Sequence, residues 1–200
     1  MFDCVIPAAG ASSRMGAWKP GLPFRGGTLL SAAAARALEA GCRAIVVAGR
    51  EAGSVPGALG ILADRVEIVP NPAWEEGMMG SLQAGMERVS SPFFLVLPAD
   101  MPFVPAAAFR LLSREAEARS AEGLPDRPIF PAFRGEPGHP VLIPSSWIPE
   151  ARLLSRDARF KDFLAARGPV YVEAADPGIR TDLDTRTEYE GALSLVSRSL

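Results

Sequence analysis

The stretch CVIPAAGASSRMG, residues 4–16, decides the class of fold to which this chain belongs. Its first three residues, Cys4 to Ile6, form a short apolar run that predicts a buried strand. The small residues from Ala8 to Gly16 have neither helical nor strand periodicity, so we expect a loop there. The strands and helices predicted after this loop then indicate how the first strand is covered.

Strands and helices alternate after the loop. Thr28 is expected to cap a helix that ends at Ala40, before Gly41. Further helices are expected over residues 78–89, after Pro105 at a first helical position, and from about Thr185. Apolar runs predict strands at residues 43–48, 66–69, 93–97, 128–133, 140–143 and 170–173.

Strands that are apolar throughout and alternate with helices predict a parallel sheet covered on both faces. Residues 134–138 read as a turn between two nearby strands, which would make the sheet mixed there. We therefore expect one α/β domain over residues 1–200, Rossmann-like, with three α/β/α layers and a mostly parallel sheet.

Composition excludes several classes of protein. Apolar residues make up 48% and charged residues 22% of the 200, which is typical of an ordinary globular core. A net charge of -2 gives no electrostatic reason to bind nucleic acid. No apolar run reaches the roughly 18 residues of a membrane span, and no secretory signal is evident. Cys4 and Cys42 are too few for a disulfide framework or a zinc site. A soluble, cytoplasmic protein is expected.

Two of the chain's cations lie in and just after this loop, Arg14 and Lys19. Lysine is scarce, because only Lys19 and Lys161 stand among 21 basic residues. Small side chains let backbone N–H groups approach an anion at the carboxyl end of a strand. The standard Gly-rich phosphate motifs are nevertheless absent. From the residues alone, this is either an anion site or a surface loop with two solvated cations.

Five blocks of sequence resemble the MobA-like nucleotidyltransferases, and most closely their molybdenum cofactor cytidylyltransferase branch. The blocks occur in the family's order: PAAGASSRMGAWKPGLPFRGGTLL (residues 7–30), NPAWEEGMMGSLQAG (71–85), LPADMPFV (97–104), GHPVL (138–142) and DLDT (182–185). The resemblance implies the nucleotide-diphospho-sugar transferase type of fold. It also implies a reaction in which a phosphorylated acceptor attacks the α-phosphorus of an NTP and expels pyrophosphate.

The resemblance implies roles for particular residues. Lys19 would stabilise charge at the α-phosphate, Arg14 would hold the β- and γ-phosphates, and Asp100 would act with them as a catalytic residue. Asp100 and Asp184 would bind Mg²⁺, with Asp184 preferred to Asp182. The residues implied to contact the nucleotide are Pro7, Ala8, Ala9, Gly10, Arg14, Lys19, Asn71, Ser81 and Asp100.

Several of these residues have structural alternatives. Asp100 could cap a turn, and Asp184 could cap the last helix. Ser81 and Gln83 could be exposed helix residues. His139 could contact the acceptor or have a structural role in a turn. Trp18 could stack on a ligand or pack against the protein.

The substrates are expected to be CTP and a molybdopterin cofactor, with a molybdoenzyme maturation partner. Residues 153–161 depart from the usual Gly-Asp-x-Gly-Ala-Arg stretch of this branch, which weakens the assignment of the acceptor. The alternatives are a nucleotidyltransferase for a sugar 1-phosphate or another phosphometabolite, and a non-catalytic nucleotide-binding module.

Overall fold

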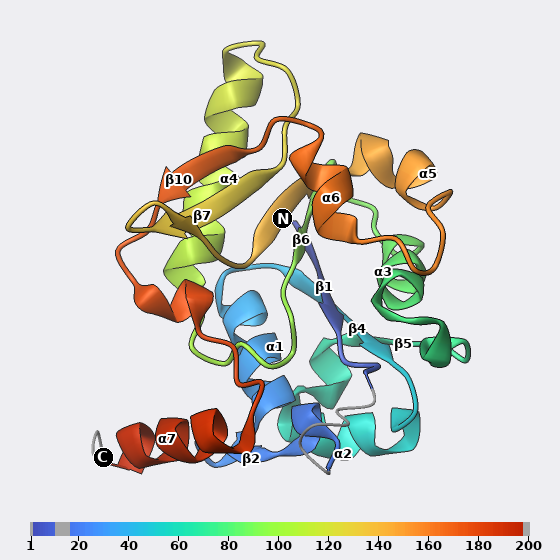
Figure 1. The fold of residues 1–200 in the computed structure, drawn as a ribbon, viewed down its shortest axis with the longest axis vertical. Coiled ribbons are helices and arrows are strands. Elements are labelled where there is room, and N and C mark those ends of the chain that lie inside the picture. Colours follow the sequence, from blue (N-terminus) through green and yellow to red (C-terminus); the bar gives the residue numbers. More distant parts are fainter. Residues whose placement is uncertain (1, 11–16, 198–200) are drawn as a thin grey trace.

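An eight-stranded sheet forms the centre of the molecule in the computed structural model, which describes residues 2–10 and 17–197 with side chains up to residue 194 (Figure 1). Its strands run in the order β10-β7-β9-β6-β1-β4-β5, and β8 pairs with β7. The strands are β1 (Asp3–Pro7), β4 (Arg43–Ala48), β5 (Glu67–Pro70), β6 (Phe93–Val96), β7 (Ile129–Phe133), β8 (Glu136–Pro137), β9 (Val141–Pro144) and β10 (Val170–Glu173).

The sheet is mixed in the way that the sequence predicts. β1 is parallel to both β4 and β6, and β10 is parallel to β7. β9 is antiparallel to β6 and β7, and β8 turns back antiparallel to β7. The turn between β7 and β8 uses Arg134 and Gly135 in the left-handed region, at φ 54° and 78°.

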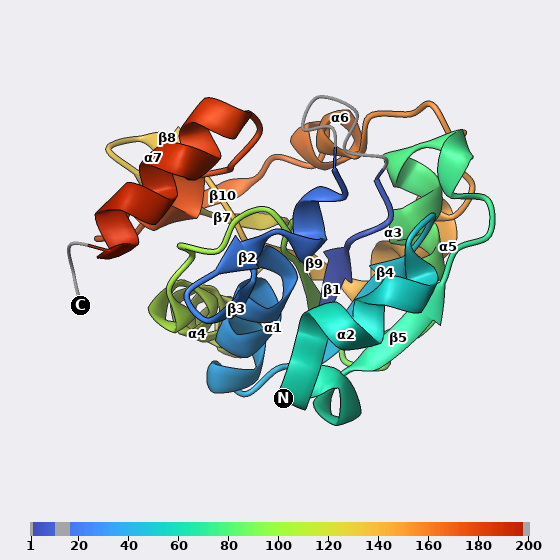
Figure 2. The same cartoon turned by 90° about the horizontal axis from the view of Figure 1, so that it is seen from below.

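Helices cover both faces of the sheet, so the expected three-layer α/β/α architecture is confirmed (Figure 2). One face carries α1, α2 and α4, and the other carries α3, α5 and α6. A short hairpin of β2 (Pro23–Phe24) and β3 (Gly27–Thr28) lies beside α7. The helices are α1 (Leu29–Glu39), α2 (Val55–Leu59), α3 (Met78–Met86), α4 (Ala106–Ala121), α5 (Ile148–Ala151), α6 (Phe160–Ala165) and α7 (Arg186–Ser197).

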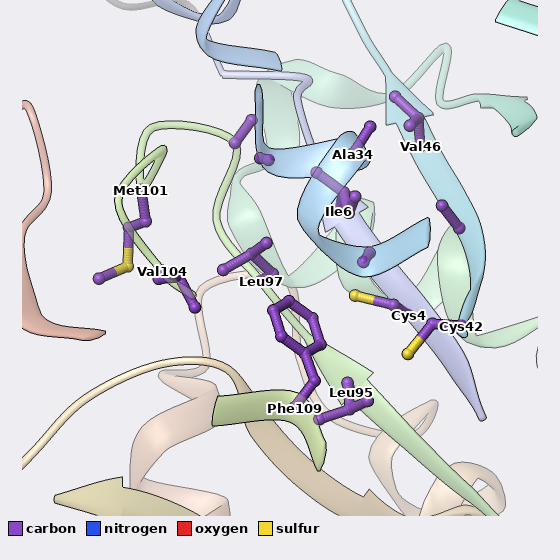
Figure 3. Packing of buried hydrophobic residues seen from close by; sticks show 14 of the residues in the cluster. Cys4, Ile6, Ala34, Cys42, Val46, Leu95, Leu97, Met101, Val104 and Phe109 are labelled. Atoms are coloured by element: carbon purple, nitrogen blue, oxygen red, sulfur yellow. The ribbon is translucent and has the colours of Figure 1, made fainter. Parts of the chain in front are cut away.

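Alternation along β1 separates the two halves of the core. Cys4 and Ile6 point to the face covered by α1 and α4, and Val5 points to the face covered by α3. Figure 3 shows the larger cluster, in which Ile6 and Phe109 pack between helix and sheet. Cys4 and Cys42 are both buried and free, as expected, and burial raises the pKa of the Cys42 thiol to about 11.

The observed end of α1 agrees with the capping residues predicted from the sequence, and the start of α4 differs from the prediction. Thr28 caps α1 through a reciprocal capping box with Ser31, and Gly41 follows the helix at φ 84°. Pro105 was expected at the first helical position, but it is the N-cap of α4. Its ψ of 148° is extended, which places it just outside the helix. Within the described residues, no helix is both long and apolar enough to cross a membrane.

Candidate active site

The site lies where the order of the strands reverses. After β1 the chain adds β4 and β5 on one side, and β6 then pairs with β1 on the other side. The segments that leave β1 and β6 therefore emerge next to each other at the carboxyl edge of the sheet. Open α/β sheets bind their ligands at this kind of switch point.

Lys19 carries its charge into the centre of this edge. It begins the short 3-10 helix Lys19–Gly21 and is buried, with 9% of its surface exposed. Its Nζ lies 2.6 Å from Asp100 Oδ2 and 2.7 Å from Asp184 Oδ1. Burial lowers the pKa of Lys19, but hydrogen bonds and charges from the two carboxylates outweigh it and raise that pKa overall. The ammonium is therefore held charged between two acids.

The two carboxylates come from segments far apart in the chain. Asp100 follows β6, and its backbone oxygen accepts a hydrogen bond from the N–H of Leu183 at 3.2 Å. Asp184 precedes α7 but does not cap it, because Thr185 and Glu188 form the reciprocal cap of that helix. Asp182 is exposed. The structure thus joins Asp184, rather than Asp182, to Lys19 and Asp100.

The backbone that leaves β1 is tightly fixed. Ala8 and Ala9 are buried, Gly10 is exposed, and Pro7 is the last residue of β1. A Cβ on Gly49 would lie 2.5 Å from the oxygen of Ala9, so glycine is required there for the two segments to approach. Arg14, expected to hold phosphates, lies outside the described residues.

Trp18 fastens the Lys19 segment to the end of β1. Its indole N–H donates to the backbone oxygen of Ala8 at 3.2 Å. A Cβ on Gly21 would lie 2.5 Å from an atom of the Trp18 ring, so the ring packs directly on that glycine. Trp18 therefore packs and donates a hydrogen bond, which the sequence had left undecided.

Asn71 and Ser81 form a buried pair beside this edge. The Asn71 side-chain amide donates to the Ser81 hydroxyl at 3.1 Å, and both residues are at most 5% exposed. Gln83 is neither exposed nor at the edge. Its amide lies within 3.0–3.3 Å of the backbone oxygens of Ala151, Arg152 and Leu154, and so holds the chain after α5.

His139 is half-buried, and its peptide bond to Pro140 is cis. Burial lowers the pKa of His139, against the opposing effects of the Val96 backbone and the Asp100 and Asp182 charges. The Nδ1 of His139 has no hydrogen-bond partner within the described part of the chain.

Sequence analysis missed Arg156. Its guanidinium nitrogen lies 2.6 Å from the place of a Cβ on Gly80, and it pairs with Glu76 at 3.2 Å. Arg156 therefore rests on the first turns of α3. The signal that could have found it is Gly80 itself, a glycine inside a helix where alanine would be favoured.

The donor set at this edge suits a hard cation. Asp100 and Asp184 converge on one ammonium, and their side chains remain 24% and 38% exposed. The Lys19 ammonium is itself a cation, and its position shows that both carboxylates can contact the same positive charge. Mg²⁺ binds through one or two carboxylates together with phosphate oxygens and water. The carboxylate pair therefore fits such an ion.

The fold is shared with solved proteins, one of which is named a nucleotidyl transferase. A nucleotidyl transferase from Methanothermobacter thermautotroptrophicus has a TM-score of 0.80 and 24% identity, covering 100% of this chain and 99% of that one. Rv0371c from Mycobacterium tuberculosis H37Rv has a TM-score of 0.81 and 24% identity, covering 96% and 97%. The chain therefore has the same fold as these two proteins.

Residues 4–170 match the model of the MobA-like NTP transferase domain, and the chain belongs to that family. Molybdenum cofactor cytidylyltransferase of Escherichia coli K12 is 28% identical over 94% of this chain and 93% of its own length. Nicotine blue oxidoreductase of Paenarthrobacter nicotinovorans is 30% identical over 90% and 91%. These two relatives are named for different reactions.

Proposed function

We propose that this protein transfers a nucleoside monophosphate from an NTP to a phosphorylated acceptor and releases pyrophosphate. The observation that carries the proposal is the buried Lys19 ammonium between Asp100 and Asp184 at the switch point of the sheet. A polyanionic substrate requires a concentrated positive charge and a carboxylate-held divalent ion, and these residues can supply both.

In the proposed reaction, an oxygen of the acceptor phosphate bonds to the α-phosphorus, and the bond from that phosphorus to the bridging oxygen breaks. The acceptor phosphate is ionised at neutral pH, so no general base is needed. Lys19 would stabilise the charge that develops at the α-phosphate. Arg14 would hold the β- and γ-phosphates, for which its bidentate geometry is suited.

The nucleotide would lie along the end of β1. Backbone groups of Ala8, Ala9 and Gly10 would face it, with Pro7 near the base. Asn71 and Ser81 would contact the base and the ribose. They would give up their mutual hydrogen bond and form hydrogen bonds to the ligand instead.

Asp100 and Asp184 would hold Mg²⁺, which would neutralise phosphate charge when bound. A structure of Rv0371c has been solved with manganese, at a TM-score of 0.75 and 23% identity to this chain. That neighbour supports a divalent ion in a protein of this fold, and the donor set described above supports one here.

CTP and a molybdopterin cofactor are the substrates that we propose, because the relative from Escherichia coli is named for cytidylyl transfer to the molybdenum cofactor. The product would then pass to a molybdoenzyme maturation partner. A sugar 1-phosphate or another phosphometabolite is the alternative acceptor, since residues 153–161 depart from the usual stretch of this branch.

The test measures pyrophosphate release by the full chain with CTP, GTP, UTP or ATP, Mg²⁺, and either molybdenum cofactor or glucose 1-phosphate. We expect turnover with CTP and the molybdenum cofactor, and its loss in Asp100→Asn. Turnover only with the sugar phosphate would change the acceptor. A parallel assay tests for redox conversion of nicotine blue, the substrate for which one relative is named. Activity there without pyrophosphate release in any mixture would overturn the proposal.

A further inference from the structure

The segment between α5 and α6 is anchored along one side of α3. The Gln83 side-chain amide lies within 3.0–3.3 Å of three backbone oxygens of residues 151–154. Further along the segment, a Cβ on Gly77 would lie 3.4 Å from the backbone oxygen of Arg156. These contacts fix the point from which the Arg156 side chain extends over the start of α3.

The Arg156 guanidinium lies against Gly80 in the first turn of α3. A Cβ on Gly80 would lie 2.6 Å from Nη1 of Arg156, so alanine there would push the guanidinium away. Glycine destabilises a helix relative to alanine, and a cation near the first turn is unfavourable as well. The stability of α3 therefore does not explain this placement.

A series of contacts joins this guanidinium to the carboxyl edge of the sheet. Gly80 precedes Ser81, whose hydroxyl accepts a hydrogen bond from Asn71 at 3.1 Å. The N–H of Asn71 donates to the oxygen of Ala48, the last residue of β4, at 2.7 Å, and β4 is the parallel neighbour of β1. The guanidinium therefore borders the part of this edge at which Asn71 and Ser81 lie.

The ion pair that holds Arg156 is exposed. Its Nε lies 3.2 Å from Oε2 of Glu76, and the two side chains are 48% and 52% exposed. Ion pairs with this exposure contribute little to stability. The guanidinium can therefore exchange Glu76 at low cost for a ligand bound beside Asn71 and Ser81.

The chemistry of a guanidinium restricts which base it can recognise. It donates hydrogen bonds from neighbouring N–H groups in one plane and accepts none, so it is matched by two acceptors that stand side by side. Cytosine presents such a pair at O2 and N3, whereas in uracil the N3–H donor separates the two carbonyl oxygens. Adenine has its amino donor next to N7, and guanine presents a pair at O6 and N7.

We propose that Arg156 gives up Glu76 and donates to O2 and N3 of cytosine, and that it thereby selects CTP over UTP. The inference rests on the proposed function, because it takes Asn71 and Ser81 to lie beside the base. It deepens that function by assigning the choice of base to the segment between α5 and α6.

The experiment measures the dissociation constants of CTP and UTP by calorimetry, with Mg²⁺ and without an acceptor. The two bases are of the same size and differ at N3 and C4, so the comparison isolates the hydrogen bonds. We expect the native protein to prefer CTP. Arg156→Met keeps an apolar stem and removes the donors, and it should reduce this preference at least about tenfold, as is typical of one bidentate contact to a base.

Arg152→Met is the matched control. Arg152 pairs with Glu87 at 2.7 Å, and the two side chains are 51% and 54% exposed, so the same kind of ion pair joins the same two segments. Glu87 caps the carboxyl end of α3, at the opposite end of the helix from Gly80. Arg152→Met should therefore leave both dissociation constants unchanged.

Glu76→Gln separates recognition of the base from a structural role of the ion pair. This variant and Arg156→Met both remove the pair, so a structural role would change CTP affinity in the same direction in both. In the proposal, Glu76 competes with the base for the guanidinium. Glu76→Gln should therefore bind CTP at least as tightly as the native protein, while Arg156→Met binds it more weakly.

An unchanged ratio of CTP to UTP affinity in Arg156→Met would overturn the inference. So would a native protein without preference for CTP, or weaker CTP binding in both Arg156→Met and Glu76→Gln. The measurement needs neither acceptor nor turnover, so it is separable from the proposed function. A CTP preference that depends on Arg156, in a protein that releases no pyrophosphate, would keep the base selection and reject the transfer reaction.

Discussion

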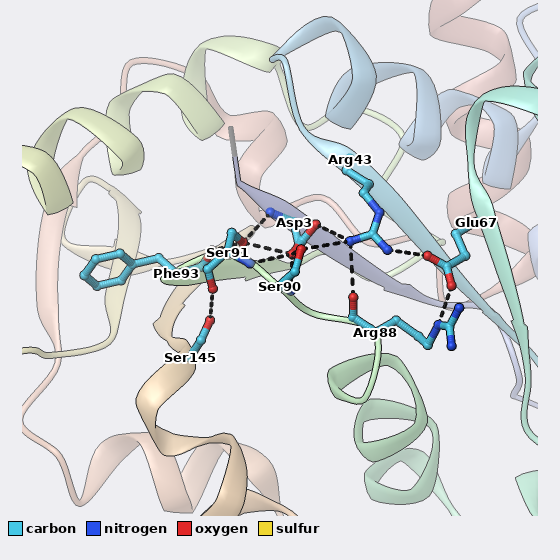
Figure 4. Close-up of polar contacts among 8 residues, drawn as sticks. All are labelled: Asp3, Arg43, Glu67, Arg88, Ser90, Ser91, Phe93 and Ser145. Carbon is cyan, nitrogen blue, oxygen red and sulfur yellow. Dashed lines mark hydrogen bonds and ion pairs between the residues drawn. The ribbon is translucent and has the colours of Figure 1, made fainter.

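The two edges of the sheet carry charged clusters that differ in how deeply their carboxylates are buried. At the amino edge, Asp3 on β1 accepts hydrogen bonds from the N–H groups of Ser90 and Ser91, from the Ser91 hydroxyl and from Arg43 (Figure 4). Arg43 also pairs with Glu67 on β5. At the carboxyl edge, two acids share one ammonium.

The difference separates stability from function. Asp3 is 3% exposed, and its donors come from rigid strand ends and the backbone of one turn, so its carboxylate is fully engaged. Asp100 and Asp184 stay partly exposed. The buried cluster around Asp3 fixes β1, β4 and β5 together, whereas the carboxylates at the carboxyl edge remain accessible from solvent.

Lys19→Ala tests the functional edge and should have the largest effect. We expect the rate of nucleotidyl transfer to fall at least about a hundredfold, because loss of such a donor costs about 3–4 kcal/mol in comparable sites. The fold should persist, as measured by circular dichroism. Native turnover in the variant would remove Lys19 from the mechanism.

Asp3→Asn tests the structural edge. We expect it to lower the free energy of unfolding by about 2–3 kcal/mol, because a buried charged acceptor with several donors is removed. The rate per folded molecule should not change. Glu39→Gln is the control, since its exposed pair with Arg36 should contribute less than about 1 kcal/mol. A loss of rate in folded Asp3→Asn would contradict this separation of the two edges.

Asp184→Asn and Asp182→Asn sharpen the assignment within the functional edge. We expect Asp184→Asn to lower the rate about tenfold and to raise the Mg²⁺ concentration needed for half-maximal rate, because it removes one of the two convergent carboxylates. Asp182→Asn should behave as the native protein, since Asp182 is exposed and Asp184 makes the contact. The reverse ranking would move the ligand to Asp182.

The pH dependence of stability should follow the amino edge. Burial raises the pKa of Asp3, but hydrogen bonds from Ser90, Ser91 and Arg43 outweigh it and lower that pKa below 3.8. A lowered pKa means that the contribution is complete above pH 3.8 and is lost as the pH falls through the folded value. The difference in unfolding free energy between native and Asp3→Asn protein should therefore shrink in denaturant titrations at pH 3. A difference that stays constant down to pH 3 would contradict it.

Much of the fold could be predicted, and less of the site. The cap of α1 at Thr28 and the mixed sheet followed from local patterns. The position of Pro105 was one residue off, because the same residue can end an extended segment or start a helix. Gln83 was expected at an exposed helix position or in the site, yet it holds the chain after α5.

By itself, the sequence determined which segments are strands and helices and which residue types carry charge, because these follow from periodicity and composition over a few neighbours. Only the tertiary structure decided that Lys19 meets Asp184 across 165 positions and that Arg156 rests on Gly80. Strand order and packing bring such partners together, and burial then makes each pairing matter. Neither is encoded within one turn of helix or one strand.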